Sequence, residues 1–91
     1  MTNKEILELN GYDDNEYVCF TNPSFEGAII GVTSDDRLVY DYNKMVVSAM
    51  KEMNVSEDEA IDWIDYNTIR ALVYTHTDRD PIIIYPFEEM E

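Results

Sequence analysis

The feature that most constrains the fold is a strand, a turn and a second strand that run directly into an amphipathic helix. "GAIIGVT" at 27–33 is rich in β-branched residues and mostly apolar, "SDDR" at 34–37 is typical of a hairpin turn, and "LVYD" follows as a second strand. Asp41 stands where an N-cap is expected, and the apolar residues after it recur with the helical period of 3.6. We therefore expect a hairpin followed by a helix that ends near residue 54.

Capping signals predict two more helices. Thr2 and Glu5 have the spacing of a capping box, so residues 3–9 are expected to form a short helix that Asn10-Gly11 ends. Ser56 and Glu59 repeat that spacing ahead of a segment with a broad apolar side. The stretch "IRALVYT" either extends this second helix or forms an irregular segment, and the pattern leaves both open.

Two further stretches favour strands. "YVCFTN" at 17–22 is a plausible strand that Pro23 ends, and "IIIYPF" at 82–87 is typical of a final buried strand. The resulting order is α-β-β-α-α-β. This order predicts an α+β domain in which the helices pack on one face of a small, mostly antiparallel sheet.

The chain length sets the number of domains. Ninety-one residues are enough for one compact domain and too few for two, so we expect a single domain over 1–91, with 88–91 as a frayed acidic tail. Hydrophobic residues make up 45% of the chain, which is enough for a packed core.

The charge is strongly one-sided. Twenty acidic residues against six basic ones give a net charge of −14, whereas a net charge of about 2 to 8 in magnitude keeps a small domain soluble. Such a surface argues against direct binding of nucleic acid and against an anionic membrane, since both need lysine and arginine. A basic protein partner fits this charge.

The compartment follows from what the chain lacks. Cys19 is its only cysteine, so no disulfide can form within the chain. The N-terminal stretch has no long apolar core of a signal peptide. We expect a cytoplasmic protein.

The most informative charged feature is a stripe of carboxylates at Asp58, Asp62 and Asp65, which are spaced i, i+4 and i+7. Like charges at this spacing destabilise a helix by roughly 0.2 to 0.5 kcal/mol per pair. Asp65 is expected near the helix end, where a carboxylate is unfavourable and Arg70 is the nearest cation in sequence.

Two interpretations of the stripe stay open. It is a solvated face, paired within the molecule to Lys44 and Lys51, or it forms an anionic surface with Asp35, Asp36 and the tail. In the second interpretation the carboxylates approximate the spacing of backbone phosphates and attract a basic protein.

Tyrosines add to this candidate surface. Tyrosine is enriched at interface hot spots and takes arginine by cation–π contact, and Tyr12 and Tyr17 lie in an acidic loop. Trp63 is expected in the core. The candidate partner-binding residues are Asp58, Asp62, Asp65, Asp35, Asp36, Tyr12, Tyr17, Tyr66 and Arg70.

Catalytic and metal-binding patterns are weak. Cys19 and His76 could form a nucleophile and its base, yet a cysteine inside "YVCF" is typical of a buried hydrophobic residue. His76 with Asp78 and Asp80 offers only a nonspecific metal-binding pattern. We expect no enzyme activity, no cofactor and no metal site.

The segments "AIIGVTSDDRLVYDYNKMV", "SEDEAIDWIDYNTIRAL" and "PIIIYP" resemble short, acidic, uncharacterised proteins of Gram-positive bacteria and their mobile elements. The resemblance covers roughly residues 23–86 and carries no catalytic residues. It implies a cytoplasmic bacterial or phage-related domain. Small acidic proteins of mobile elements include anti-restriction and anti-CRISPR inhibitors, which this chain matches in charge and size by analogy.

The function we expect is that of a non-enzymatic acidic protein-binding module. One form of it is a nucleic-acid-mimicking inhibitor of a basic nucleic-acid-binding protein. The alternative is an adaptor or a homo-oligomeric domain, such as a homodimer, in which the acidic face only provides solubility. The salt dependence of binding distinguishes the two functions, because only the charge-driven interaction weakens sharply as ionic strength rises.

Overall fold

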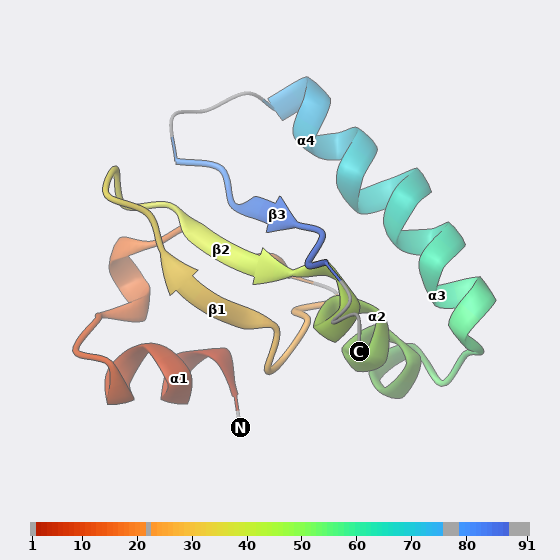
Figure 1. Cartoon of the computed structure of the whole chain (residues 1–91), viewed down its shortest axis with the longest axis horizontal. Coiled ribbons are helices and arrows are strands. Elements are labelled where there is room, and N and C mark those ends of the chain that lie inside the picture. Colours follow the sequence, from red (N-terminus) through yellow and green to blue (C-terminus); the bar gives the residue numbers. More distant parts are fainter. Residues whose placement is uncertain (1, 22, 76–78, 88–91) are drawn as a thin grey trace.

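The structure is a computed structural model that describes residues 2–21, 23–75 and 79–87, and it confirms an α+β fold (Figure 1). The strands form one sheet, and the helices lie beside it and at its end. The helices are α1 (Asn3–Leu9), α2 (Tyr42–Met53), α3 (Glu57–Trp63) and α4 (Arg70–Thr75), with a 3-10 turn η1 (Asp14–Glu16) and a π-helical segment η2 (Ile64–Ile69). The strands are β1 (Ile29–Val32), β2 (Leu38–Asp41) and β3 (Ile82–Ile84).

The sheet has the order β1-β2-β3 and is mixed. β1 and β2 form the expected hairpin, in which Val32 pairs with Leu38. β3 returns after the helices and pairs parallel to β2, with Val39 opposite Ile82. The prediction of a mostly antiparallel sheet is therefore wrong for the β3 side, because a helical crossover returns the chain in the same direction.

Two strand predictions need correction. Residues 17–21 are extended but form no strand, since the backbone N–H of Phe20 donates to the Tyr40 hydroxyl at 3.2 Å instead of to a neighbouring strand. The final strand is shorter than 82–87 and is not buried. β3 is an edge strand, and Ile84 keeps 37% of its surface exposed.

The joint between β2 and α2 contains no loop. Asp41 is the last residue of β2 and also the N-cap of α2, and its carboxylate accepts from the Lys44 backbone N–H at 3.0 Å. The helix ends at Met53, with Asn54 in the left-handed conformation that ends many helices. The predicted helix start and end are confirmed.

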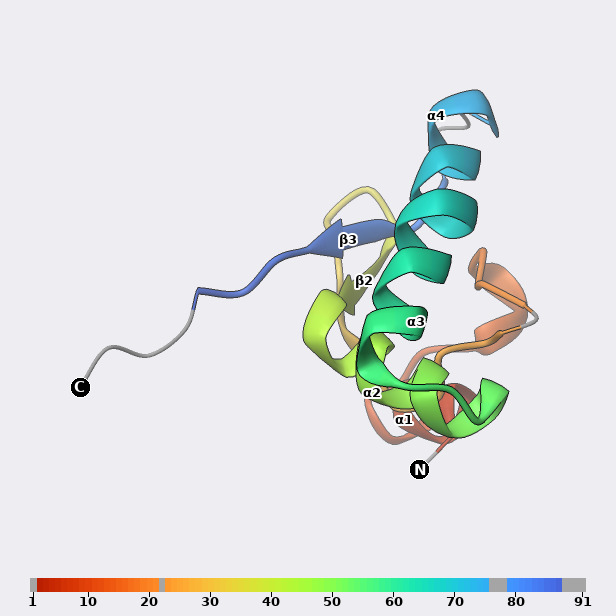
Figure 2. The same ribbon diagram turned by 90° about the vertical axis from the view of Figure 1, so that its right-hand side faces the viewer.

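The segments α3, η2 and α4 follow one another without a break, so "IRALVYT" extends the helix (Figure 2). Ala60, Ile64 and Thr68 are buried at a strict spacing of four residues. In an α-helix this spacing drifts by about 40° per step. The wider π turn counters the drift, and the Asn67 side chain donates to the Trp63 carbonyl at 3.0 Å within it.

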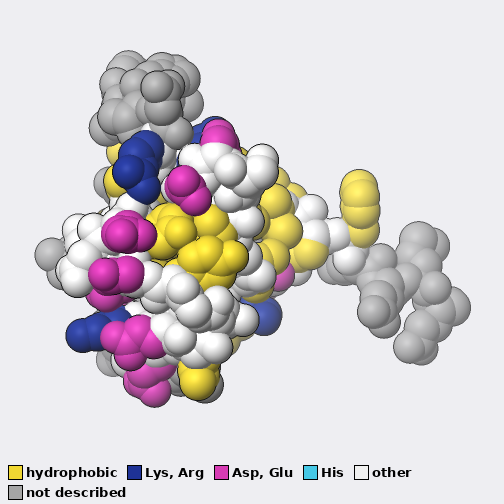
Figure 3. All heavy atoms as spheres, turned by 90° about the vertical axis from the view of Figure 1, so that its left-hand side faces the viewer, with side chains coloured by type: hydrophobic (Ala, Val, Ile, Leu, Met, Phe, Trp, Pro, Cys, Tyr) yellow, Lys and Arg dark blue, Asp and Glu magenta, His cyan; other side chains and the backbone are white. Residues whose placement is uncertain are grey.

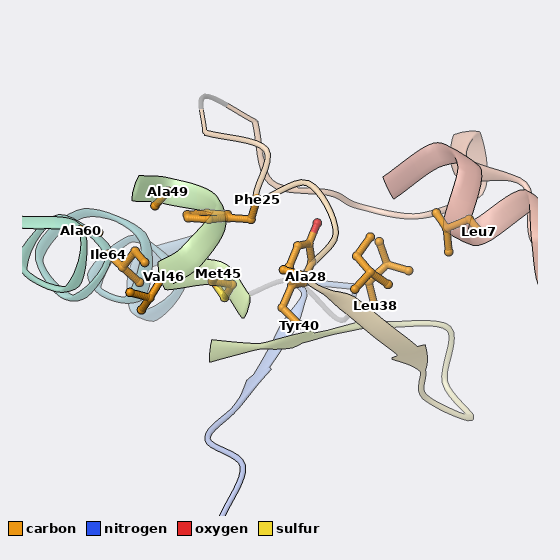
Figure 4. Packing of buried hydrophobic residues seen from close by; sticks show 11 residues of the cluster. Leu7, Phe25, Ala28, Leu38, Tyr40, Met45, Val46, Ala49, Ala60 and Ile64 are labelled. Atoms are coloured by element: carbon orange, nitrogen blue, oxygen red, sulfur yellow. The ribbon is translucent and has the colours of Figure 1, made fainter. Parts of the chain in front are cut away.

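One hydrophobic core joins the sheet to the helices (Figure 4). Leu38 and Tyr40 alternate along β2 and are both fully buried, so they point to the same face of the sheet. Helices α1, α2 and α3 each contribute side chains to this core, and of these helices α2 packs directly on the sheet, against β2. The core residues are Leu7, Phe25, Ala28, Ile29, Leu38, Tyr40, Met45, Val46, Ala49, Ala60 and Ile64.

Candidate partner-binding surfaces

The α3 acidic stripe, which we define as Asp58, Asp62 and Asp65, is exposed along its whole length. Asp58 lies in the first turn of α3, where the helix dipole favours a carboxylate. Asp58 and Asp62 make no hydrogen bond or ion pair with any residue in the described ranges. Lys44 and Lys51 likewise form no ion pair there, so the expected internal pairing with these lysines is not observed.

The surroundings of Asp65 differ from the expectation. Because the helical run continues to Thr75, Asp65 does not lie at a helix C-terminus. Its carboxylate accepts a hydrogen bond from the Tyr42 hydroxyl at 2.9 Å. The Arg70 guanidinium lies over the Tyr66 ring instead, 4.9 Å from the ring centroid. Asp65 is thus held by a tyrosine, and Arg70 by an aromatic face.

Tyr42, Asp65 and Tyr85 form a cluster that we call the Tyr42 cluster. The Tyr42 and Tyr85 rings lie 4.7 Å apart at an angle of 40°. Desolvation, the hydrogen bond to Asp65 and the Asp65 charge raise the pKa of Tyr42 to about 12. Desolvation and then Asp65 also raise the pKa of Tyr85. The cluster joins the start of α2, the start of η2 and the end of β3.

A second group lies on the hairpin side of the molecule. The Tyr12 and Tyr17 rings meet edge to face, with centroids 5.8 Å apart. Desolvation and then the negative charge of Asp36 raise the pKa of Tyr17. Asp35 accepts from the Thr33 hydroxyl, and this hydrogen bond lowers the pKa of the Asp35 carboxyl. Figure 3 shows this side, where acidic side chains border an apolar area.

The candidate residues therefore fall into two groups and do not form one continuous surface. The hairpin turn with Asp35 and Asp36 lies at the opposite end of the molecule from α3 (Figure 1). Tyr66 and Arg70 belong with the α3 acidic stripe, and Tyr12 and Tyr17 with the hairpin. The tail 88–91 lies outside the described residues.

A groove that the sequence did not predict lies between residues 18–21 and 23–25 on one side and the helical run from α3 to α4 on the other. Its volume is about 330 Å³, and its lining is mostly apolar. Phe20 lines one wall, Trp63 and Leu72 line the other, and Pro81 also contributes to the lining. Trp63 is half-buried against the core rather than inside it. Only the folded chain brings these residues together, so no local pattern marks the groove.

Cys19 also lines this groove, where desolvation and then the charge of Asp14 raise the pKa of its thiol. A raised pKa disfavours the reactive thiolate. His76 and Asp78 lie outside the described residues, so the structure does not show the suggested pairing with Cys19 or the metal-binding loop. In the described ranges, no three His, Cys, Asp or Glu side chains gather closely enough to hold a metal ion.

Comparisons with known proteins give no family, since no family model, no curated protein and no solved structure matches the chain. Across the part of the chain that the structure describes, no helix is long and apolar enough to span a membrane.

Proposed function

We propose that this protein is a non-enzymatic acidic binding module whose α3 acidic stripe engages a basic protein partner. The observation that carries the proposal is the exposure of Asp58 and Asp62 without any hydrogen bond or ion pair to a described residue. Among the described residues no cation pairs with Asp58 or Asp62 to offset the repulsion along this stripe, and a cationic partner would relieve it.

The aromatic side chain next to the stripe suits an arginine-bearing partner. Tyr66 is 67% exposed, and Arg70 already lies over its ring. A cation–π contact of this kind contributes about 0.5–1 kcal/mol at an exposed site. A guanidinium from a partner can bind the neighbouring carboxylates and stack on this ring, or exchange with Arg70 there. Arginine residues on the partner are therefore the expected ligands.

The net charge of −14 extends the proposal to the kind of partner. A protein that binds nucleic acid presents a groove rich in lysine and arginine, and a surface with this excess of carboxylates competes for such a groove. In this form the protein is a nucleic-acid-mimicking inhibitor of anti-defence type. The support is charge and size, by analogy with small inhibitors of mobile elements.

A variant with fewer charges tests the stripe directly. Asp58→Asn with Asp62→Asn removes two charges without breaking any internal contact in the described structure. The immobilised protein is incubated with bacterial lysate at about 0.05 M and about 0.5 M salt, between which screening becomes much stronger. We expect basic, nucleic-acid-binding proteins to be retained at low salt, released at high salt, and retained several-fold less by the variant.

A matched control separates local recognition from general charge. Glu5→Gln with Glu8→Gln removes the same charge from α1, and glutamine can still complete the capping box at Thr2. This control variant should retain the same proteins as the unmodified chain. If the α3 variant binds as well as the control, or if the same proteins stay bound at high salt, the proposal is wrong.

A further inference from the structure

The last described residues form an exposed apolar arm, which we call the C-terminal arm and define as Tyr85–Phe87. The arm leaves the body beyond β3, and Figure 2 shows it running away from the segment before β1. Phe87 is 99% exposed and Tyr85 is 59% exposed. The Tyr85 ring contacts Tyr42, so the base of the arm is fixed while its tip has no contact with the body.

The apolar groove beside Trp63 suits an aromatic side chain. Phe20, Trp63 and Leu72 offer apolar surface on two sides of a volume of about 330 Å³. In Figure 2 the arm points to the side opposite residues 18–21, which form part of one wall of this groove. The arm of one molecule thus points away from its own groove.

We propose that two copies of this chain form a dimer by exchanging C-terminal arms, with Phe87 of each copy bound in the groove of the other. Tyr85–Phe87 carries no charged residue, so the part of the arm that inserts is apolar, while Glu88 and Glu89 follow it directly in the sequence. The exchange is reciprocal, as a twofold-symmetric dimer requires. It removes a fully exposed aromatic ring from water in both copies.

The charge of the chain sets the salt dependence of this dimer. Each copy carries a net charge of −14, so the two copies repel each other at low ionic strength. Added salt screens the repulsion and leaves the apolar contact intact, so self-association should strengthen with salt. Binding of a basic partner weakens with salt instead. The two proposals can therefore fail independently.

Sedimentation equilibrium at low and high salt measures the dimer, and fluorescence of Trp63 reports the groove, because this is the only tryptophan in the chain. We expect the dissociation constant to fall with salt and the Trp63 emission to shift to shorter wavelength as the dimer forms. Burying a phenylalanine ring contributes about 1.5–3 kcal/mol, so Phe87→Ala should weaken the dimer by roughly tenfold or more per exchanged arm.

A mixing experiment tests the exchange itself. Ala71 lies on the groove wall, and Ala71→Phe should fill the groove while keeping the arm. Each variant alone should dimerise weakly, whereas a mixture of Phe87→Ala with Ala71→Phe has one intact arm and one intact groove and should form a heterodimer. Leu9→Ala, at a residue that is 73% exposed on α1, is the control and should dimerise normally.

Circular dichroism confirms that each variant is folded before these comparisons. The proposal is overturned if the chain stays monomeric at both salt concentrations up to about millimolar protein, a range that includes weak association. A dimer that Phe87→Ala leaves unchanged, or a mixture that associates no better than its separate variants, also overturns it.

Discussion

Two copies of the tripeptide Asp-Tyr-Asn, at 41–43 and 65–67, meet in the folded chain. The Tyr42 hydroxyl of the first copy donates to the Asp65 carboxylate of the second at 2.9 Å. This contact fixes the start of α2 against η2. It depends on a neutral tyrosine next to a charged carboxylate, so it should respond to alkaline pH.

Stability should fall at high pH because of Tyr42. The pKa of Tyr42 rises from 10.0 to about 12 in the folded chain, so folding favours the neutral phenol. This contribution is complete below pH 10 and is lost as the pH rises through about 12. Urea unfolding of Tyr42→Phe should show a loss of roughly 1 kcal/mol at pH 8 that shrinks toward pH 11.

Tyr66→Phe controls for this experiment, since Tyr66 is exposed and its ring can still lie under Arg70. Its free energy of unfolding should follow that of the unmodified chain at every pH. A constant difference between Tyr42→Phe and the unmodified chain from pH 8 to pH 11 would contradict the assignment to Tyr42.

The buried Tyr40 hydroxyl leads to a second prediction for a single residue. Tyr40 is fully buried, and its hydroxyl oxygen accepts from the Phe20 backbone N–H. Tyr40→Phe leaves this N–H without its acceptor, so the free energy of unfolding should fall by about 1–3 kcal/mol. Urea unfolding at neutral pH measures the change. Tyr12→Phe, at an exposed tyrosine, should be nearly neutral.

Among the elements, η2 is the one that departs from regular geometry. Its wider turn keeps Thr68 on the buried side of the helical run, in line with Ala60. A π turn corresponds to one residue more than a regular helix accommodates. Removing one residue there should therefore restore an α-helix without exposing the core side.

Deletion of Asn67 tests this interpretation. The deletion removes the extra residue and also the side chain that donates to the Trp63 carbonyl, and it leaves Ile64 and Thr68 three positions apart, which still places them on one face. The variant should stay folded and helical by circular dichroism. Deletion of the exposed Val47 in α2 is the control and should destabilise the chain strongly, because it turns the buried Ala49 by about 100° relative to Met45 in a regular helix. Equal losses for both deletions would contradict the interpretation.

Local signals in the sequence predict the element boundaries well. Thr2, Asp41 and Ser56 each accept a backbone N–H at a helix start, which is chemistry that a few neighbouring residues determine. η2 was not predicted, because it depends on how the helical run packs against the core. The strand expected at 17–22 failed for a related reason, since the propensity of its residues cannot show that Tyr40, distant in sequence, takes the Phe20 N–H.

At the scale of the molecule, the net charge of −14 should lower stability at low ionic strength. The range of repulsion falls from about 30 Å at 0.01 M salt to about 8 Å at 0.15 M. The melting temperature should therefore rise with salt by several degrees, since about 1 kcal/mol corresponds to roughly 4–8 °C in a domain of this size.

Thermal unfolding by circular dichroism, at a protein concentration that keeps the chain monomeric, measures this rise. Glu5→Gln with Glu8→Gln carries two charges fewer and should respond less to salt. A melting temperature that does not depend on salt would show that the charges are too far apart to oppose folding.

The sequence indicated which types of residue are candidates for binding, but it did not indicate which of them lie together on one surface. Carboxylate spacing along one helix is visible in the sequence, so the α3 acidic stripe was found. The roles of Tyr42 and Tyr85 were not, because their contacts join three elements. The groove beside Trp63 was not predicted for the same reason, because its two walls lie about forty residues apart in the chain.

The joint at Asp41 also limits how this chain can evolve. One residue ends β2 and begins α2, so an insertion between them would rotate the helix by about 100° and turn Met45 and Ala49 away from the sheet. Natural variants should therefore tolerate changes of length in the turn at 33–37 and in the loop at 10–13, and should conserve the spacing from Leu38 to Ala49. An alignment of such variants should contain no insertion or deletion between Leu38 and Ala49.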